Sequence, residues 1–136
     1  MDLLTDTFNS ILIPFDQFIQ ITGRIAPRYY TIASSHSSDP SLLDITLAVK
    51  RDEIPSLRSQ FTGFVSGYLE RLAESPNLVR GFVIESAFEL PKTTVPIVMV
   101  CTGAGLAPFR AFLQELSYRA KVLKTEPSKV ILIVRV

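Results

Sequence analysis

The sequence contains one cysteine, one histidine and no tryptophan among its 136 residues. Because Cys101 stands alone, an internal disulfide and a cysteine-rich metal site are excluded. His36 alone likewise leaves no histidine cluster for zinc, so no metal ligands are predicted. A formal net charge of +1 provides no broad basic surface, so nucleic acid is not expected as a partner.

Long apolar runs are also missing. The longest candidate, Val95 to Phe109, is interrupted by prolines, a threonine and two glycines, and it falls short of the roughly 18 residues that cross a bilayer. The first residues carry acids where a secretory signal carries positive charge. These features predict a chain with no membrane segment in a reducing, cytoplasmic compartment.

The most informative stretch that is present runs from Pro27 to Ser35. Its tyrosines, threonine and isoleucine favour a strand, and a period of two places Arg28 and Tyr30 on one side. An arginine fork suits a phosphate or carboxylate, and a tyrosine can stack on a planar ring. This pattern predicts a strand with a ligand face. On this stretch alone, an ordinary strand whose arginine reaches solvent is the alternative.

Shorter elements surround this strand. The spacing of apolar residues predicts two short helices within residues 2–22, the second with Pro14 in its first turn. A strand is predicted from Leu42 to Lys50, antiparallel to the Pro27–Ser35 strand. A loop from Arg51 to Gln60 and a strand from Val79 to Glu85 are also predicted. A turn at Gly63 leads into an amphipathic helix that places Val65, Leu69 and Leu72 together. The start of that helix offers free amides and a positive dipole end, which suit a phosphate.

The last third of the chain has a different character. Pro96 to Cys101 is a continuous apolar run typical of a buried parallel strand. A glycine turn then leads into a helix from about Leu106 to Ala120, and Val130 to Val136 forms a second apolar strand. This order is the opening βαβ unit of a nucleotide-binding sheet. Because two strands do not complete such a sheet, the sequence predicts a segment of a larger protein, cut at both ends.

The first strand and its neighbours resemble the FAD and NADPH half of the diflavin reductase family. That family carries Arg-x-Tyr-Ser/Thr followed by Ile-Ala-Ser-Ser, and residues 28–35 match it without a gap. The resemblance implies that Arg28 binds the FAD pyrophosphate, Tyr30 stacks on the isoalloxazine and Thr31 hydrogen-bonds near flavin N5. The pairing of Tyr29 with Tyr30 is most similar to the P450 reductase branch.

Two further elements extend the implied FAD site. The family's Gly-x-x-Ser/Thr helix start is met here, and its amides would hold the pyrophosphate. One edge of the second strand corresponds to the segment that the family lays along the flavin and adenine. The implied contacts are Gly63, Phe64, Val65 and Ser66 at the helix start, and Thr46, Leu47 and Ala48 on the strand.

The third element resembles the family's grip on the NADPH pyrophosphate. Gly103, Ala104 and Gly105 occupy the turn, which continues with Ala-Pro-Phe as in the family. Cys101 replaces the family's first glycine and Ala104 replaces its threonine. Loss of the threonine hydroxyl removes one hydrogen bond to an anion, worth about 1.5 to 3 kcal/mol, so weakened nucleotide binding is expected.

The predicted fold class is mixed β and α/β. Residues 1–91 are expected to form a partial antiparallel FAD-binding β-barrel domain with an N-terminal helical segment. Residues 92–136 are expected to form the first βαβ unit of a truncated, Rossmann-like NADP-binding domain. No catalytic side chain is assigned, because the cofactor carries the redox chemistry.

The resemblance implies electron transfer from NADPH through FAD to an FMN domain or flavodoxin-like partner, and then to a haem-protein acceptor. FMN would sit in a domain that the sequence does not contain, and full-length relatives can be anchored on the cytosolic face of the endoplasmic reticulum. Because the family's nicotinamide-side residues are missing, weak or no catalysis is expected of this chain alone.

Three other functions compete with this interpretation. One is a non-catalytic truncated or diverged fragment that only binds flavin or another protein. A serine hydrolase is excluded because no Gly-x-Ser-x-Gly elbow accompanies His36. A P-loop is excluded because no Gly-Lys-Ser/Thr follows the glycines.

Overall fold

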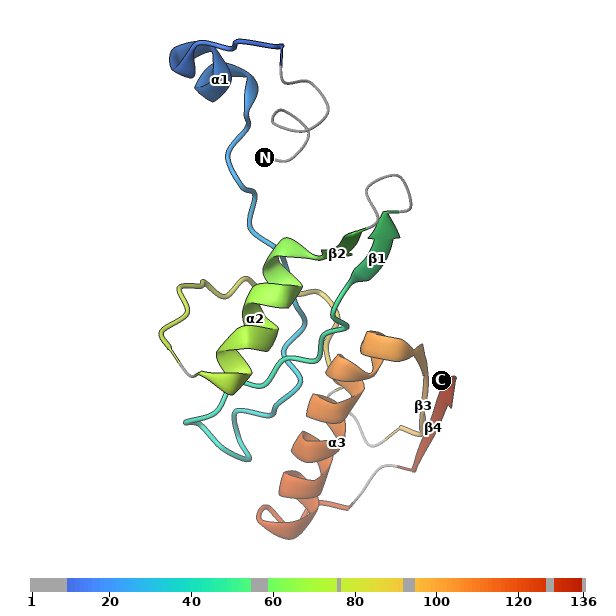
Figure 1. The fold of residues 1–136 in the computed structure, drawn as a ribbon. Coiled ribbons are helices and arrows are strands. Elements are labelled where there is room, and N and C mark those ends of the chain that lie inside the picture. The colour runs from blue at the N-terminus through green and yellow to red at the C-terminus, as the bar shows by residue number, and fades with distance from the viewer. Residues whose placement is uncertain (1–9, 55–58, 76, 92–94, 127–128, 136) are drawn as a thin grey trace.

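The computed structural model describes residues 10–54, 59–75, 77–91, 95–126 and 129–135 (Figure 1). Its elements, in chain order, are α1 Phe15–Ile21, β1 Arg51–Ile54, β2 Ser59–Thr62, α2 Phe64–Glu74, β3 Ile97–Thr102, the 3₁₀ turn η3 Gly103–Gly105, α3 Leu106–Lys121 and β4 Val130–Arg135. The fold is therefore mixed, with helices and two small sheets. No closed barrel is formed by the residues described.

The C-terminal unit follows the predicted order of strand, glycine turn, helix and strand. β3 and β4 are parallel, in a register that runs from Ile97 opposite Val130 to Thr102 opposite Arg135. Side chains alternate between the two faces of this sheet: Met99 is 1% exposed, whereas its neighbour Val98 is 63% exposed. α3 lies along the covered face (Figure 1). The apolar periodicity thus predicted both strands and the helix.

The prediction of two continuous strands, from Pro27 to Ser35 and from Leu42 to Lys50, is wrong. They share one isolated antiparallel bridge, between Ile32 and Ile45. The Ser34 hydroxyl donates to the Leu42 carbonyl at 3.3 Å and accepts the Asp44 N–H at 2.9 Å. These side-chain bonds replace backbone rungs that a longer ladder would need.

Two further predictions are corrected. The expected loop from Arg51 to Gln60 contains β1 and part of β2, which pair as an antiparallel hairpin with Arg51 opposite Thr62. This hairpin is charged on both faces, so its apolar pattern carried no signal. The expected strand from Val79 to Glu85 has no regular structure, and its apolar side chains, such as Val83 at 70%, are exposed.

α1 begins directly after Pro14, which is its N-cap residue, as the sequence predicted to within one position. The other helix predicted within residues 2–22 falls mainly on residues outside the described ranges. α1 buries none of its residues and stands apart from the other elements in Figure 1. No helix within the described ranges is long and apolar enough to cross a membrane.

Candidate cofactor site

The first residues of the motif that resembles the FAD segment are largely accessible to solvent. Arg28 is exposed, and its Nη1 donates to the Ala26 carbonyl at 2.7 Å. Because a guanidinium has five N–H donors, most of them remain available to an anion. Tyr30 is half-buried, while Tyr29 is 68% exposed and packs edge-on against Phe82 with ring centroids 6.3 Å apart. The two tyrosines therefore have different surroundings, as the period of two predicts.

The bridge between Ile32 and Ile45 brings two predicted contacts together. In an antiparallel pairing, the residue before one bridge partner faces the residue after the other, so Thr31 and Thr46 lie across from each other. Thr31 is exposed and Thr46 is half-buried. Among the other two predicted contacts on this segment, Leu47 is half-buried and Ala48 exposed.

The start of α2 is held close to Lys50. The Gly63 N–H donates to the Lys50 carbonyl at 2.8 Å, and the Ser66 hydroxyl accepts the Lys50 N–H at 3.2 Å. A Cβ at position 63 would lie 2.6 Å from Ser66 Oγ and 3.0 Å from Lys50 Cβ, so this approach requires glycine. The Ser66 hydroxyl is thus already hydrogen-bonded within the fold. No side chain caps the helix, so the amides of Phe64 and Val65 are the donors open to a ligand.

One short segment, from Ile45 to Lys50, joins these two parts. Its first residue bridges to the Arg28 strand, and its last residue holds the start of α2. Since an extended chain advances about 3.3 Å per residue, five steps keep the two ends within about 17 Å. The structure therefore places the Arg28 strand and the Gly63 turn at opposite ends of the same segment.

The second glycine turn lies at the carboxyl end of β3. Gly103 has a φ of +52°, a conformation that favours glycine. Gly103, Ala104 and Gly105 are all exposed, and no side chain caps α3 behind them. Exposed amides at a helix N-terminus after a parallel strand suit a phosphate. The Ala104 methyl group offers no hydroxyl to such an anion, as the sequence implied.

The sequence did not point to a set of side chains on α3 that contact the Arg28 strand. We call this set the α3 clamp: Arg110, Gln114 and Glu115. Arg110 Nη1 donates to the Ala33 carbonyl at 2.8 Å and to Asp44 Oδ2 at 2.6 Å.

Both other clamp residues contact Ser35. Gln114 Oε1 accepts the Ser35 N–H at 2.9 Å, and Glu115 Oε2 accepts the Ser35 hydroxyl at 2.7 Å. The signal in the sequence was the spacing of four positions between Arg110 and Gln114, which places these two on one helix face, whereas Glu115 lies about 100° further around the helix. That spacing is also common on solvated helices, so it did not single out these residues.

Glu115 is held in its charged form. Partial burial acts to raise its pKa, but hydrogen bonds from Ser35, Arg119 and Ser37 and the charge of Arg119 outweigh this and lower the pKa below its ordinary value. Arg119 Nε donates to Glu115 Oε1 at 2.7 Å, one helical turn away. The carboxylate therefore accepts from both α3 and the segment that follows the FAD-like strand.

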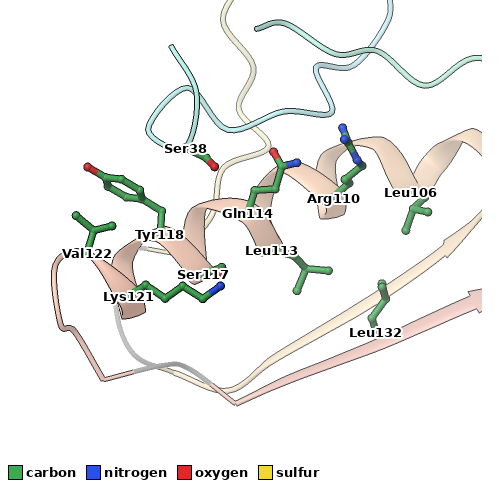
Figure 2. A pocket seen from close by; sticks show the side chains of 10 residues that line it. All are labelled: Ser38, Leu106, Arg110, Leu113, Gln114, Ser117, Tyr118, Lys121, Val122 and Leu132. Carbon is green, nitrogen blue, oxygen red and sulfur yellow. The ribbon is translucent and has the colours of Figure 1, made fainter. Parts of the chain in front are cut away.

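A cavity of about 620 Å³ runs along α3 (Figure 2). Figure 2 shows Arg110 and Gln114 directed toward the segment that carries Ser38, while Leu113 points toward Leu132 of β4. None of the predicted cofactor contacts lines this cavity, and its Arg110 is already paired with Asp44. We therefore do not assign the cofactor to it.

Within the described ranges, no group of three or more His, Cys, Asp or Glu side chains could hold a metal ion. In the same ranges, every buried side-chain nitrogen and oxygen has a hydrogen-bond partner.

Comparison with known proteins gives no match to a family model. The chain is 39% identical over 116 residues to a bifunctional cytochrome P450/NADPH–P450 reductase of Bacillus subtilis, over 84% of this chain and 11% of the relative. It is 37% identical over 108 residues to an NADPH–cytochrome P450 reductase of Musca domestica, over 77% of this chain and 16% of the relative. It is 36% identical over 121 residues to an NADPH-dependent diflavin oxidoreductase of Dictyostelium discoideum, over 87% of this chain and 19% of the relative.

These similarities confirm the resemblance to the diflavin reductase family that was drawn from the motifs, over the segment of each relative that the chain matches. The chain spans between 11% and 19% of the length of these three relatives.

Proposed function

We propose that this chain is the FAD-binding part, with the first part of the NADP-binding unit, of an NADPH-dependent diflavin reductase. The observation that carries the proposal is the segment from Ile45 to Lys50. At one end it bridges to Ile32, four residues after the exposed Arg28, and at the other end it holds an uncapped helix start. A dinucleotide needs this combination, because it presents both a planar ring and a pyrophosphate.

The residues present fit FAD. Arg28 keeps most of its N–H donors for the pyrophosphate, and the amides of Phe64 and Val65 complete an anion site with a favourable helix dipole. Tyr30 would stack on the isoalloxazine, and Thr31 would hydrogen-bond near flavin N5. The segment of Thr46, Leu47 and Ala48 would line the flavin and adenine edge.

The nucleotide turn supports NADPH in the same way. Gly103, Ala104 and Gly105 would bring backbone amides to the pyrophosphate at the start of α3. We place a partial FAD-binding β-barrel domain in residues 1–91 and a Rossmann-like NADP-binding domain from residue 92 onward. The parallel pairing of β3 and β4 and the cover of α3 support the second assignment.

Bound FAD would accept a hydride from NADPH and release electrons one at a time. The protein would bind and orient the two nucleotides. Electrons would pass to an FMN domain or flavodoxin-like partner and then to a haem-protein acceptor, in a cytoplasmic setting. The names of the relatives, which pair NADPH with cytochrome P450, support this acceptor.

An FAD titration tests the proposal. Arg28→Ala should weaken binding roughly 10- to 100-fold, because it removes charge-assisted hydrogen bonds to the pyrophosphate. The matched control is Arg24→Ala, which removes an exposed arginine outside the motif and should leave the affinity unchanged. A parent chain that does not bind FAD, or equal affinities for the two variants, would contradict the proposal.

A second candidate is a non-catalytic module that binds flavin or another protein. It is favoured by the apolar face of the β3–β4 sheet, where Val100 and Ile133 are 64% and 53% exposed. The two functions differ in one observation. The reductase predicts that NADPH bleaches the absorption of bound flavin under anaerobic conditions, at the slow rate expected of this chain alone, whereas the non-catalytic module predicts an unchanged spectrum.

A further inference from the structure

We propose that Arg110 and Glu115 are positioning residues that fix the FAD strand relative to the NADP turn. This inference rests on the proposed function and extends it to side chains that touch neither cofactor. The α3 clamp joins two parts of the chain that lie more than 70 positions apart in sequence, Ala33–Ser35 and α3.

The clamped segment is the direct continuation of the FAD motif. Ala33 is fully buried, at 0% exposure, and Ser35 is 6% exposed. Ala33 follows Thr31 by two residues, so its position limits the path of the motif. Because buried backbone groups need partners, displacement of this segment would leave polar groups unpaired.

All four backbone polar groups of Ala33 and Ser35 are hydrogen-bonded. The Ala33 N–H donates to the Asp44 carbonyl at 2.8 Å, while its own carbonyl accepts from Arg110. The Ser35 N–H donates to Gln114, and the Ser35 carbonyl accepts from the N–H groups of Ser38 and Asp39. Of these five hydrogen bonds, two are made with side chains of α3.

The other end of α3 is the nucleotide turn. Arg110 lies five positions after Gly105, which corresponds to about 7.5 Å along a helix axis. A rigid helix therefore connects the turn to the clamped strand. Arg110 also pairs with Asp44, which directly precedes Ile45. The same helix is therefore connected to the segment from Ile45 to Lys50 as well.

Charge strengthens the hydrogen bonds of the α3 clamp. The contacts from Arg110 and Glu115 involve ionised groups, and such hydrogen bonds are about twice as strong as neutral ones. Within the described ranges, the charged group in contact with Glu115 is Arg119 on its own helix, and on the other segment Glu115 accepts from the Ser35 hydroxyl and also from Ser37. Loss of the acceptor at position 115 would thus release Ser35.

The test compares four variants of the chain. Arg110→Ala and Glu115→Ala remove clamp contacts, whereas Glu115→Gln keeps an oxygen that can accept from Ser35. Arg51→Ala is the matched control, because it breaks the Arg51–Glu70 ion pair of similar exposure elsewhere in the fold. FAD affinity, amide hydrogen exchange at Ala33 and Ser35, and the visible circular dichroism of saturated flavin are measured for each.

We expect Arg110→Ala and Glu115→Ala to weaken FAD binding roughly tenfold, the loss of one charge-assisted hydrogen bond. Exchange at Ser35 should accelerate by a similar factor even without FAD, and the dichroism of saturated flavin should change. Glu115→Gln should lose only about threefold, because its neutral hydrogen bond is about half as strong as the charged one, and Arg51→Ala should stay within about twofold of the parent affinity. Rescue by Glu115→Gln distinguishes positioning from a general loss of stability.

Three outcomes separate this inference from the proposed function. If the parent chain binds no FAD, the proposed function fails and the inference fails with it. If the parent binds FAD but all four variants match it in affinity and dichroism, the inference alone is overturned. If Arg110→Ala loses helical circular dichroism, the two Glu115 variants still test the positioning role. Equal FAD affinity and flavin dichroism of Glu115→Ala and Glu115→Gln would contradict that role.

Discussion

The Arg110 guanidinium lies 2.6 Å from the Asp44 carboxylate, although the two residues are 66 positions apart in the chain. The same Nη1 atom also reaches the carbonyl of buried Ala33. One side chain of α3 thus connects both segments that meet at the Ile32–Ile45 bridge. The relative position of the two proposed cofactor elements depends on this contact.

The two contacts of Arg110 should differ in energy. Both side chains of the ion pair are more than 40% exposed, so its coupling should be only about 0.2 to 1 kcal/mol. Arg110→Ala also strips a partner from the Ala33 carbonyl, which adds about 1 to 3 kcal/mol. A double-mutant cycle with Asp44→Ala, followed by urea unfolding, should therefore show a larger cost for Arg110→Ala than for Asp44→Ala. Equal costs would indicate that the Ala33 contact contributes nothing.

Glu115 should make stability depend on pH in the acid range. Its folded pKa lies below the ordinary value of 4.5, so the carboxylate binds fewer protons in the folded chain than in the unfolded one. Its contribution is complete above pH 4.5 and is lost as the pH falls through the folded pKa. Asp39 acts in the same direction, since the Ser41 hydroxyl and then the Ser41 N–H lower its pKa. Urea unfolding between pH 3 and 6 should therefore show a shallower slope for Glu115→Gln than for the parent, and identical slopes would refute this account.

Gly63 should tolerate no side chain. An added Cβ would meet Ser66 Oγ and Lys50 Cβ, and rotation of the serine would break its bond to the Lys50 N–H. Gly63→Ala should reduce the free energy of unfolding by about 1 to 3 kcal/mol. Gly81→Ala is the control, because nothing lies within 4 Å of its added Cβ, and its stability should equal or slightly exceed that of the parent. A Gly63→Ala variant as stable as Gly81→Ala would contradict the structure.

The two faces of the β3–β4 sheet should respond differently to truncation. Met99 is 1% exposed beneath α3, and Met99→Ala should cost at least about 2 kcal/mol of unfolding free energy. Its neighbour Val98 is 63% exposed on the other face, so Val98→Ala should cost far less in this chain. Thermal unfolding followed by circular dichroism measures both. Equal shifts in midpoint would mean that α3 does not cover the Met99 face.

The C-terminal unit was predictable because its signals agree. Apolar runs mark both strands, the glycine turn follows the first of them, and the helix has one apolar face. The same reasoning located α2, since Gly63 precedes an amphipathic pattern. The motif match for Arg28 and Tyr30 needed no structure, because those residues are only two positions apart in the chain.

The remaining features depend on contacts that are distant in sequence. Ser34 uses its hydroxyl in place of strand hydrogen bonds, and nothing in a pattern of period two reveals that exchange. The β1–β2 hairpin has charged residues on both faces and is closed by the bond from Gly63 to the Lys50 carbonyl. The partners of Arg110 become apparent only when α3 is placed beside residue 33. Pattern reasoning detects local periodicity and does not detect such pairings.

In the proposed FAD site, Tyr30 lies against the flavin. Flavin fluorescence at saturating FAD tests this stacking in the parent chain, Tyr30→Phe and Tyr30→Ala. Because a phenyl ring retains the stacking surface, we expect quenched fluorescence in the first two and recovered fluorescence in Tyr30→Ala, with affinity reduced roughly 2- to 10-fold. Equal fluorescence in all three, or no FAD binding by the parent chain, would contradict it.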